Sequence, residues 1–328
     1  MGISGPDAVL RNLLSGSGIR YSGAETFGGL TVIPLLLKHP PAEREYLLLE
    51  EAVAAGTIVV DEVGGGVVAR LLVHNLGERP VLLIDGEQLI GAKQNRILNT
   101  TILVAARSKL EIPVACVEQG RWGRSLGAMS PAETLFPEAR RAKAEAVTRS
   151  VRLSGVYEAD QSLVWEQVAH RLRTIGVQSP TSAILDAYRQ RDTDLEAYAR
   201  AFTWRDGQAG VICGIGGAVA CADLFDHPET LRRLYPRLIR SYALDALGIE
   251  RGEVDSTAGQ RFLEAASRAT MTVHPAVGLG EEVRLTGEGV TGSALVAEGS
   301  VVHLALFPAV RGPAAEPTAP PSRRRRFR

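Results

Sequence analysis

Short apolar runs separated by glycine or proline turns fill the first part of this 328-residue chain and restrict its fold more than any other feature. Six such runs predict strands, at Leu30–Leu37, Thr57–Val63, Val67–Val73, Val81–Ile84, Ile97–Ala105 and Leu110–Val117. The turn Gly64–Gly66 offers the positive φ that a tight hairpin requires, and Pro113 is expected at a sheet edge or a bulge. Strands this short, joined by turns and not by long helices, favour an antiparallel barrel or sandwich over a doubly wound parallel sheet.

Helical periodicity dominates after residue 125, although a short amphipathic helix is also predicted at Asp7–Leu14. Ser130-Pro131 and Pro137 introduce helical stretches that run to about Val151. Further helices are predicted at Ala159–Ile175, Ser182–Gln190, Asp194–Phe202, Pro228–Leu247 and Thr257–Ala269. Asp194 and Asp226 are interpreted as N-terminal caps, since aspartate is favoured in that position.

Strands return near the end of the chain. A hairpin is predicted around Gly216-Gly217, and three closing strands follow at Glu282–Leu285, Ser293–Val296 and Val301–Phe307. The prediction is therefore an α+β fold, with a mainly antiparallel β-barrel or β-sandwich packed against a helical part and returning strands. Its divisions are a β-rich domain at 1–125, a helix-rich part at 126–308 that can share its core, and a disordered Pro/Arg-rich tail at 309–328.

Composition excludes several classes of protein. Lys+Arg and Asp+Glu both number 37, so the chain as a whole has no charge bias toward nucleic acid. It has no apolar run of the ~18 residues that a spanning helix needs and no signal peptide at its start, which predicts a cytoplasmic globular protein. Three cysteines without a CxxC pair, and histidines without an HExxH motif, argue against disulfides and zinc. The tail, with six arginines and one glutamate from Ala309 onward, could contact an acidic partner or nucleic acid.

The densest polar cluster follows a predicted buried strand, from Asp85 to Thr101. Gly86 and Gly91 permit tight turns or the close approach of a ligand to the backbone. Lys93 and Arg96 suit phosphate or carboxylate, and the amides nearby can recognise a sugar or a base edge. The alternative is structural: these side chains would satisfy the polar groups of buried turns and strand ends.

A second polar cluster, Glu118–Arg124, leaves the end of the strand predicted at Leu110–Val117. Its acid, two arginines and tryptophan can form a stacking platform with a charged clamp. Alternatively, Trp122 closes the end of the β core while Glu118 pairs with Arg121. Because both clusters lie at strand ends, we expect Asp85–Thr101 and Glu118–Trp122 to form one pocket for a phosphorylated nucleotide or sugar.

Two carboxylates in these clusters, Glu87 and Glu118, are the candidate catalytic groups, as general bases toward water in a hydrolase. The other candidates are expected to bind the ligand. The cations would hold phosphate, the indole would stack on a base and the amides would contact polar edges. These residues are Lys93, Gln94, Asn95, Arg96, Asn99, Arg121 and Trp122. A magnesium ion on Asp85, Glu87 and Glu118 is a variant, since hard cations prefer carboxylate oxygen, and the sequence identifies no other cofactor. A ligand sensor without catalysis, or a structural protein whose tail recruits a partner, would fit the same residues.

Other candidates have plainer explanations. Gly214–Val219 is similar to a dinucleotide-binding loop, but Val219 replaces its third glycine, which favours the hairpin. Cys213 and Cys221 are interpreted as small buried apolar groups. Asp223 is interpreted as a helix cap, and His303 as a strand residue.

Several uncommon strings occur together in an order typical of one prokaryotic family. They are LTVIPL at Leu30–Leu35, DGEQLIGAKQNR at Asp85–Arg96, LNTTILV at Leu98–Val104, IPVACVEQGRW at Ile112–Trp122, and the hairpin and helix of Gly210–Leu247. From Leu30 to Phe307 the chain thus resembles the ARG and rhodanese-phosphatase superfamily-associated proteins. The resemblance implies, through association with ADP-ribosylglycohydrolases and rhodanese-like phosphatases, work on ADP-ribose-like or NAD-derived nucleotides. It carries over no catalytic residues.

Overall fold

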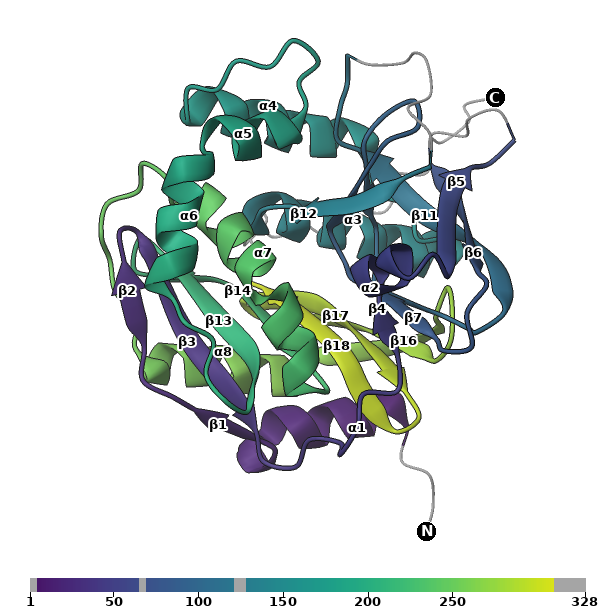
Figure 1. Ribbon diagram of the computed structural model, residues 1–328. Helices are drawn as coiled ribbons and strands as arrows, with labels where there is room; N and C mark the ends of the chain where they lie inside the picture. Colours follow the sequence, from purple (N-terminus) through teal and green to yellow (C-terminus); the bar gives the residue numbers. More distant parts are fainter. Residues whose placement is uncertain (1–4, 65–68, 121–127, 310–328) are drawn as a thin grey trace, which may run out of the picture.

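The computed structural model describes residues 5–64, 69–120 and 128–309, and within these ranges the strands form sheets of nine, six and three strands (Figure 1). The sheets are antiparallel except where β4 (Leu47–Leu48) pairs in parallel with β7 (Val81–Leu83). Helices cover the sheets and fill the space between them. The predicted α+β fold with mainly antiparallel sheets is confirmed.

The nine-stranded sheet combines the first strands of the chain with the last ones. Its order is β1-β3-β13-β14-β18-β17-β16-β15, with β2 also paired to β3. The bounds are β1 (Ile19–Tyr21), β2 (Glu25–Phe27), β3 (Leu30–Leu37), β13 (Gln208–Ile215), β14 (Ala218–Phe225), β15 (Thr270–Pro275), β16 (Glu281–Gly287), β17 (Val290–Ala297) and β18 (Ser300–Phe307). The β13–β14 hairpin is confirmed, and Gly216 and Gly217 have the positive φ values, 57° and 86°, that its turn needs.

The six-stranded sheet has the order β12-β8-β9-β11-β6-β5, and the three-stranded sheet has the order β10-β7-β4. Their remaining bounds are β5 (Ile58–Glu62), β6 (Arg70–Asn75), β8 (Glu87–Ile90), β9 (Arg96–Leu98), β10 (Ile102–Val104), β11 (Ser108–Cys116) and β12 (Ser130–Thr134). Strand β11 changes partner from β6 to β9 directly after Pro113, which agrees with the irregular position predicted for that proline. Most of the Gly64–Gly66 turn lies outside the described residues.

One predicted strand, Ile97–Ala105, is instead two strands in two different sheets. The chain leaves the six-stranded sheet after Leu98 and enters the three-stranded sheet at Ile102. The residues between them, Asn99, Thr100 and Thr101, direct their side chains to partners on other elements. Apolar periodicity on both sides of this break concealed it, because each half is a buried strand by itself.

Helices cover both faces of the nine-stranded sheet. Alternate residues of β13 face opposite ways, so Ile212 packs in one apolar cluster with Phe262 and Cys213 packs in another with Leu238. The helices in the described ranges are α1 (Pro6–Asn12), a π-helix (Leu13–Ser17), α2 (Leu49–Ala54), α3 (Pro137–Ser154), α4 (Gln161–Thr174), α5 (Ile184–Gln190), α6 (Asp192–Ala201), α7 (Pro228–Ala246) and α8 (Ser256–Arg268). As predicted, Cys213 and Cys221 are buried free thiols.

Three local predictions about helices are wrong. Ser130–Thr134 is the edge strand β12, where Pro131 is tolerated because no further strand needs its N–H. Asp194 lies in the first turn of α6 and does not cap it, since the helix begins at Asp192. The cap of α7 is His227, whose side chain accepts from the Glu229 N–H. Asp226 does not take that role.

The division of the chain near residue 125 stays a prediction. Hydrogen bonds between β3 and β13 cross it, so the first strands share a sheet with later ones. Among the described residues, no helix has both the length and the apolar character needed to cross a bilayer.

Candidate functional site

The two predicted polar clusters meet in the structure. The Asn95 N–H donates to Glu118 Oε2 at 3.2 Å, and Gln94 Nε2 donates to the Glu118 carbonyl at 3.0 Å. Arg96 Nη1 in turn donates to Gln94 Oε1 at 2.8 Å. We call Lys93, Gln94, Asn95, Arg96 and Glu118 the loop cluster. Within it Lys93 is half-buried and the other four side chains are buried.

The backbone that leads into the loop cluster adopts unusual conformations. Gly91 has φ 130° and Ala92 has φ 43°, a region that residues with a side chain seldom adopt. A Cβ on Gly91 would lie 2.9 Å from the Ala128 carbonyl oxygen, so the close approach of these two segments requires glycine. The Lys93 N–H is held by Glu62 Oε1 at 2.9 Å. Strain of this kind persists where the surroundings fix the chain, and it is frequent at functional sites.

The second carboxylate oxygen of Glu118 also has a partner, because Thr181 Oγ1 donates to Glu118 Oε1 at 3.0 Å. Glu118 is thus held between the loop cluster and the segment that precedes α5. Arg121 and Trp122 lie outside the described residues, and with them the predicted clamp, the stacking platform and the alternative Glu118–Arg121 pair.

Glu87, the other candidate general base, belongs to a different environment. Its Oε1 accepts from Arg237 Nη2 of α7 at 2.8 Å, and its Oε2 accepts from the Ile84 N–H at 3.2 Å. Burial raises the pKa of Glu87 above its ordinary value, although the Arg237 charge acts against this. These partners lie on α7 and beside β7, whereas those of Glu118 lie in the loop cluster and before α5.

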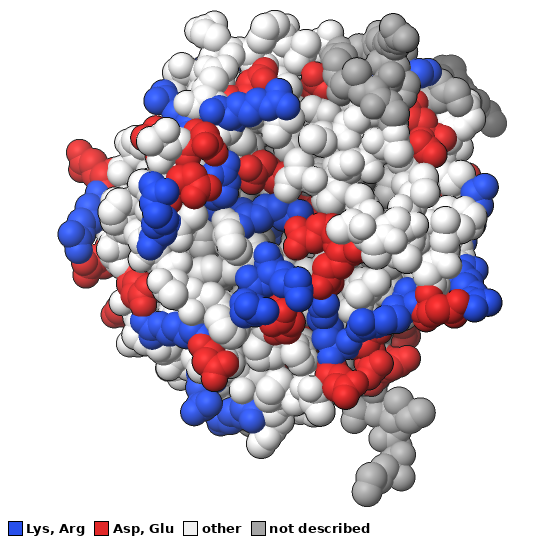
Figure 2. All heavy atoms as spheres, viewed as in Figure 1, with Lys and Arg blue, Asp and Glu red and all other residues white. Residues whose placement is uncertain are grey.

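Arg237 belongs to a row of arginines along α7 that are paired with acids of neighbouring elements. Arg233 pairs with Glu51 of α2, and Arg240 pairs with Glu133 of β12. Figure 2 shows the result on the face that it draws, where basic and acidic side chains lie side by side over α7 and α2. Pairing of this kind fastens α7 to the strands and leaves little unbalanced charge there.

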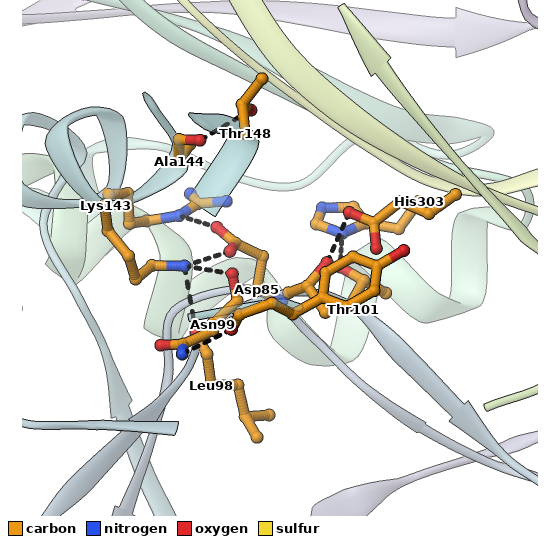
Figure 3. Close-up of polar contacts among 12 residues, drawn as sticks. Asp85, Leu98, Asn99, Thr101, Lys143, Ala144, Thr148 and His303 are labelled. Atoms are coloured by element: carbon orange, nitrogen blue, oxygen red, sulfur yellow. Dashed lines mark hydrogen bonds and ion pairs between the residues drawn. The ribbon is translucent and has the colours of Figure 1, made fainter. Parts of the chain in front are cut away.

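Asp85 points into the interior and contacts two cations of α3 (Figure 3). Lys143 Nζ donates to its carboxylate and, at 3.0 Å each, to the Leu98 and Asn99 carbonyls. Arg140 Nε donates to Asp85 at 3.3 Å. Burial alone would raise the pKa of Asp85, but the charges of Lys143 and Arg140 outweigh it and lower that pKa.

Asp223 of β14 extends the same set of contacts. It accepts a two-pronged pair of bonds from Arg140 at 2.6 and 2.8 Å and a bond from the Tyr242 hydroxyl at 2.6 Å. His303 Nε2 lies 3.2 Å from it, and His303 Nδ1 lies 2.7 Å from Thr101 Oγ1. The Arg140 and His303 contacts overcome the effect of burial and hold the pKa of Asp223 far below its ordinary value.

A second ion pair continues the contacts toward β16. Glu282 accepts from Thr100 Oγ1 at 2.6 Å and pairs with Arg284, whose guanidinium lies 5.5 Å from the centre of the Tyr157 ring. Asn99 Nδ2 donates to the Tyr157 carbonyl at 2.9 Å. We call the whole set the interior network: Asp85, Asn99, Thr100, Thr101, Arg140, Lys143, Tyr157, Asp223, Tyr242, Glu282, Arg284 and His303.

The charges of the interior network balance, with three acids and three strong bases. Its ionised members are at most 3% exposed. Burial lowers the pKa of Lys143, and contact with Asp85 counters that effect. A buried charge is tolerated when it is paired and hydrogen-bonded. These pairs and bonds join Asp85 and the segment 99–101 to α3 and to the nine-stranded sheet.

The three carboxylates of the magnesium variant do not converge. Asp85 is engaged by α3, Glu87 by α7, and Glu118 by the loop cluster. In the described ranges, no group of three or more His, Cys, Asp or Glu side chains is arranged to hold a metal ion. The residues named for this variant therefore do not form its ligand set.

A family model described as ARG and Rhodanese-Phosphatase-superfamily-associated Protein domain matches residues 18–307. The chain belongs to this family. The match confirms the resemblance predicted from the sequence strings. No curated protein and no solved structure gives a significant match.

In this family member, sequence reasoning missed most of the interior network. Arg140, Lys143, Asp223 and His303 come from α3, β14 and β18, far from the predicted clusters. Two signals were available. Lys143 is one of four lysines in a chain rich in arginine, and Asp223 is a charged residue inside an apolar strand. Asp223 was interpreted as a helix cap, which is wrong because it lies within β14 and contacts Arg140.

Proposed function

We propose that the chain binds a phosphorylated nucleotide or sugar at the loop cluster. The observation that carries the proposal is the direct bonding of Glu118 to Asn95 and Gln94, which joins two segments more than twenty residues apart into one polar cluster. Lys93 supplies a cation suited to phosphate. Asn95, whose Oδ1 accepts from the Gly91 N–H at 3.4 Å, adds an amide, a group of the kind that recognises a sugar or a base edge.

The class of nucleotide comes from the family. Its description names an association with ARG and rhodanese-phosphatase-superfamily proteins. Because the resemblance described above implies ADP-ribosylglycohydrolases, ADP-ribose and NAD-derived nucleotides are the first ligands to test. This is support by association, and the loop cluster supplies the chemical groups that such a ligand requires. The arginine-rich tail, proposed to contact an acidic partner or nucleic acid, lies outside the described residues.

Binding without catalysis fits the contacts better than hydrolysis. Both carboxylate oxygens of Glu118 accept hydrogen bonds, from the Asn95 N–H and the Thr181 hydroxyl, which fixes this side chain as a support for the loop. Glu87 is occupied by Arg237. If turnover is detected, Glu118 is the better placed general base, because it lies with the proposed ligand-binding groups.

Calorimetric titration with ADP-ribose, ADP and ribose 5-phosphate tests the proposal, using Lys93→Ala and the matched control Lys109→Ala. Lys109 is an exposed lysine of β11 at the end remote from Cys116, so its removal changes the net charge equally. We expect Lys93→Ala to weaken binding about tenfold, the equivalent of roughly 1.4 kcal/mol for a lost charge-assisted contact. Binding that is equal in both variants, or absent for all three ligands, would contradict the proposal.

Product analysis after prolonged incubation separates a binding module from an enzyme. We expect ADP-ribose to be recovered unchanged. Hydrolysis that Glu118→Gln abolishes and Glu87→Gln preserves would instead make the loop cluster a catalytic site.

A further inference from the structure

A cavity of about 630 Å³ lies where the three-stranded sheet meets the nine-stranded sheet. Leu103 of β10 lines it together with Ala297 and Val302 of the β17–β18 hairpin. Leu279, which is 41% exposed, also lines it. These walls are apolar, and no residue of the loop cluster is among them. The volume suits a small organic ligand.

Two hydrogen-bonded side chains, Tyr46 and Asp226, are among the polar residues that line the cavity. The Tyr46 hydroxyl lies 2.5 Å from Asp226 Oδ1 and 2.8 Å from Thr230 Oγ1. Asp226 is half-buried and lines the cavity directly after β14. His227 caps α7, so the Asp226 carboxylate does not serve as the helix cap and instead lines the cavity with one oxygen bonded to Tyr46.

The charge of the cavity is negative. Glu43, Glu45 and Glu298 line it together with Asp226, and no lysine, arginine or histidine is among the described residues of its lining. Arg44 lies 5.7 Å from the centre of the Tyr46 ring, but its guanidinium is engaged by both oxygens of Glu51, at 2.7 and 2.8 Å. An anionic ligand would therefore meet four carboxylates, whereas a cation would meet complementary charge.

Burial raises the pKa of Asp226 to about 6, against the lowering effects of the Tyr46 hydroxyl, the nearby backbone N–H groups and Arg44. The carboxylate is therefore mostly ionised at pH 7.5 and mostly protonated at pH 5. A partly buried carboxylate in an apolar cavity gains more from an ammonium partner than an exposed one does, because its interaction is less screened by water.

We infer that this cavity binds a protonated alkylamine, with its ammonium group on Asp226 and its methylene chain against Leu103 and Val302. The site is separate from the loop cluster and does not depend on the function proposed there. The same chemistry could come from a free diamine or from a lysine side chain of a partner, and the test includes both.

Binding of cadaverine to the full chain, followed by calorimetry and ligand-observed NMR at pH 7.5, tests the inference. We expect saturable binding, with pentane-1,5-diol, which has the same chain without the charge, binding at least tenfold more weakly. Asp226→Asn keeps a partner for Tyr46 and should weaken cadaverine at least tenfold. The control Asp61→Asn removes an exposed acid of β5 and should leave affinity within twofold.

Two further measurements keep the test decisive. Glu298→Gln changes an exposed residue of the hairpin and should weaken cadaverine a few fold even if Asp226→Asn fails to fold. Lowering the pH from 7.5 to 5 should weaken binding about tenfold, as expected for a carboxylate with a pKa near 6 and a ligand that stays protonated.

The arms of the experiment also identify the source of the amine. A blocked peptide, acetyl-Gly-Lys-Gly-amide, that binds more tightly than cadaverine supports a lysine of a partner, and the reverse order supports a free amine. Equal binding of the diol and the diamine, full affinity in both Asp226→Asn and Glu298→Gln, or no binding of either amine would overturn the inference. Lys93→Ala should leave cadaverine affinity unchanged, so this site and the loop cluster can fail separately.

Discussion

In the interior network each ionised side chain contacts an opposite charge. In the loop cluster the described bonds instead join Glu118 to amide and hydroxyl groups, and Arg96 to an amide oxygen. Asp85 and Asp223 share Arg140 across two sheets and a helix. Glu118 instead holds the turn at Asn95, beside a half-buried lysine. The first arrangement is closed and charge-balanced, as a fastening between elements requires. The second gathers a lysine, an arginine and two side-chain amides near a strained turn, and groups of this kind suit the ligand proposed above.

The largest expected effect comes from breaking the interior network. Arg140→Met removes the main partner of Asp223 and one partner of Asp85 while roughly preserving volume. Because it leaves a fully buried carboxylate without its cation, we expect a loss of about 3–5 kcal/mol in the free energy of unfolding, measured by urea denaturation.

The neighbouring residue provides the control for this substitution. Arg141, also on α3, pairs near the surface with the exposed Glu138 and the half-buried Glu145. Since surface pairs contribute at most about 1 kcal/mol, Arg141→Met should cost no more than that. Equal costs for the two variants would mean that the interior network does not fasten the sheets.

The sequence predicted strands and turns well where local chemistry decides them. The run LTVIPLLL becomes β3 with the predicted bounds, and Gly216-Gly217 forms the predicted turn. The interior network could not be predicted in the same way. Its bonded members are up to 202 residues apart in the sequence, and each one alone is typical of a helix face or a strand.

Asp226 shows how one neighbour changes an interpretation. Proline is favoured in the first position of a helix, and Pro228 occupies that position in α7. The cap is then residue 227, not 226, and the imidazole of His227 accepts the bond that a capping carboxylate would have accepted. The position of Pro228 therefore indicates residue 227 as the cap, whereas nothing local to Asp226 indicates its partner Tyr46, which is 180 residues away in the sequence.

A second prediction separates the two carboxylates that were candidates for catalysis. Glu87→Gln replaces the charged partner of Arg237 by a neutral one inside the protein, so we expect a loss of about 1–3 kcal/mol in the free energy of unfolding. The affinity for the ligand of the loop cluster should not change. Glu118→Gln keeps a carbonyl oxygen for Asn95, so we expect a stability loss near 1 kcal/mol and a severalfold weaker affinity. Urea denaturation and ligand titration of both variants measure this. The reverse pattern would place the ligand beside α7.

The smallest expected effect concerns the turn that leads into the loop cluster. Ala92 is buried with φ 43°. Ala92→Gly destabilises the fold in two ways, because it removes a buried methyl group worth about 0.8 kcal/mol and raises the backbone entropy of the unfolded state. It also stabilises the fold, because it relieves a left-handed conformation that costs roughly 1–2 kcal/mol. The net change should be within about 0.5 kcal/mol. Ala144 is a buried alanine inside α3 that has no such strain to relieve, so Ala144→Gly should cost about 2 kcal/mol.

Ligand binding gives a second measurement of the same turn. Because the strained turn precedes Lys93, Ala92→Gly should weaken ligand binding two- to threefold at nearly unchanged stability. Ala144→Gly should not produce this combination. Equal stability losses in the two variants would show that the turn stores no strain. The loop cluster would then differ from the interior network only in how its charges are paired.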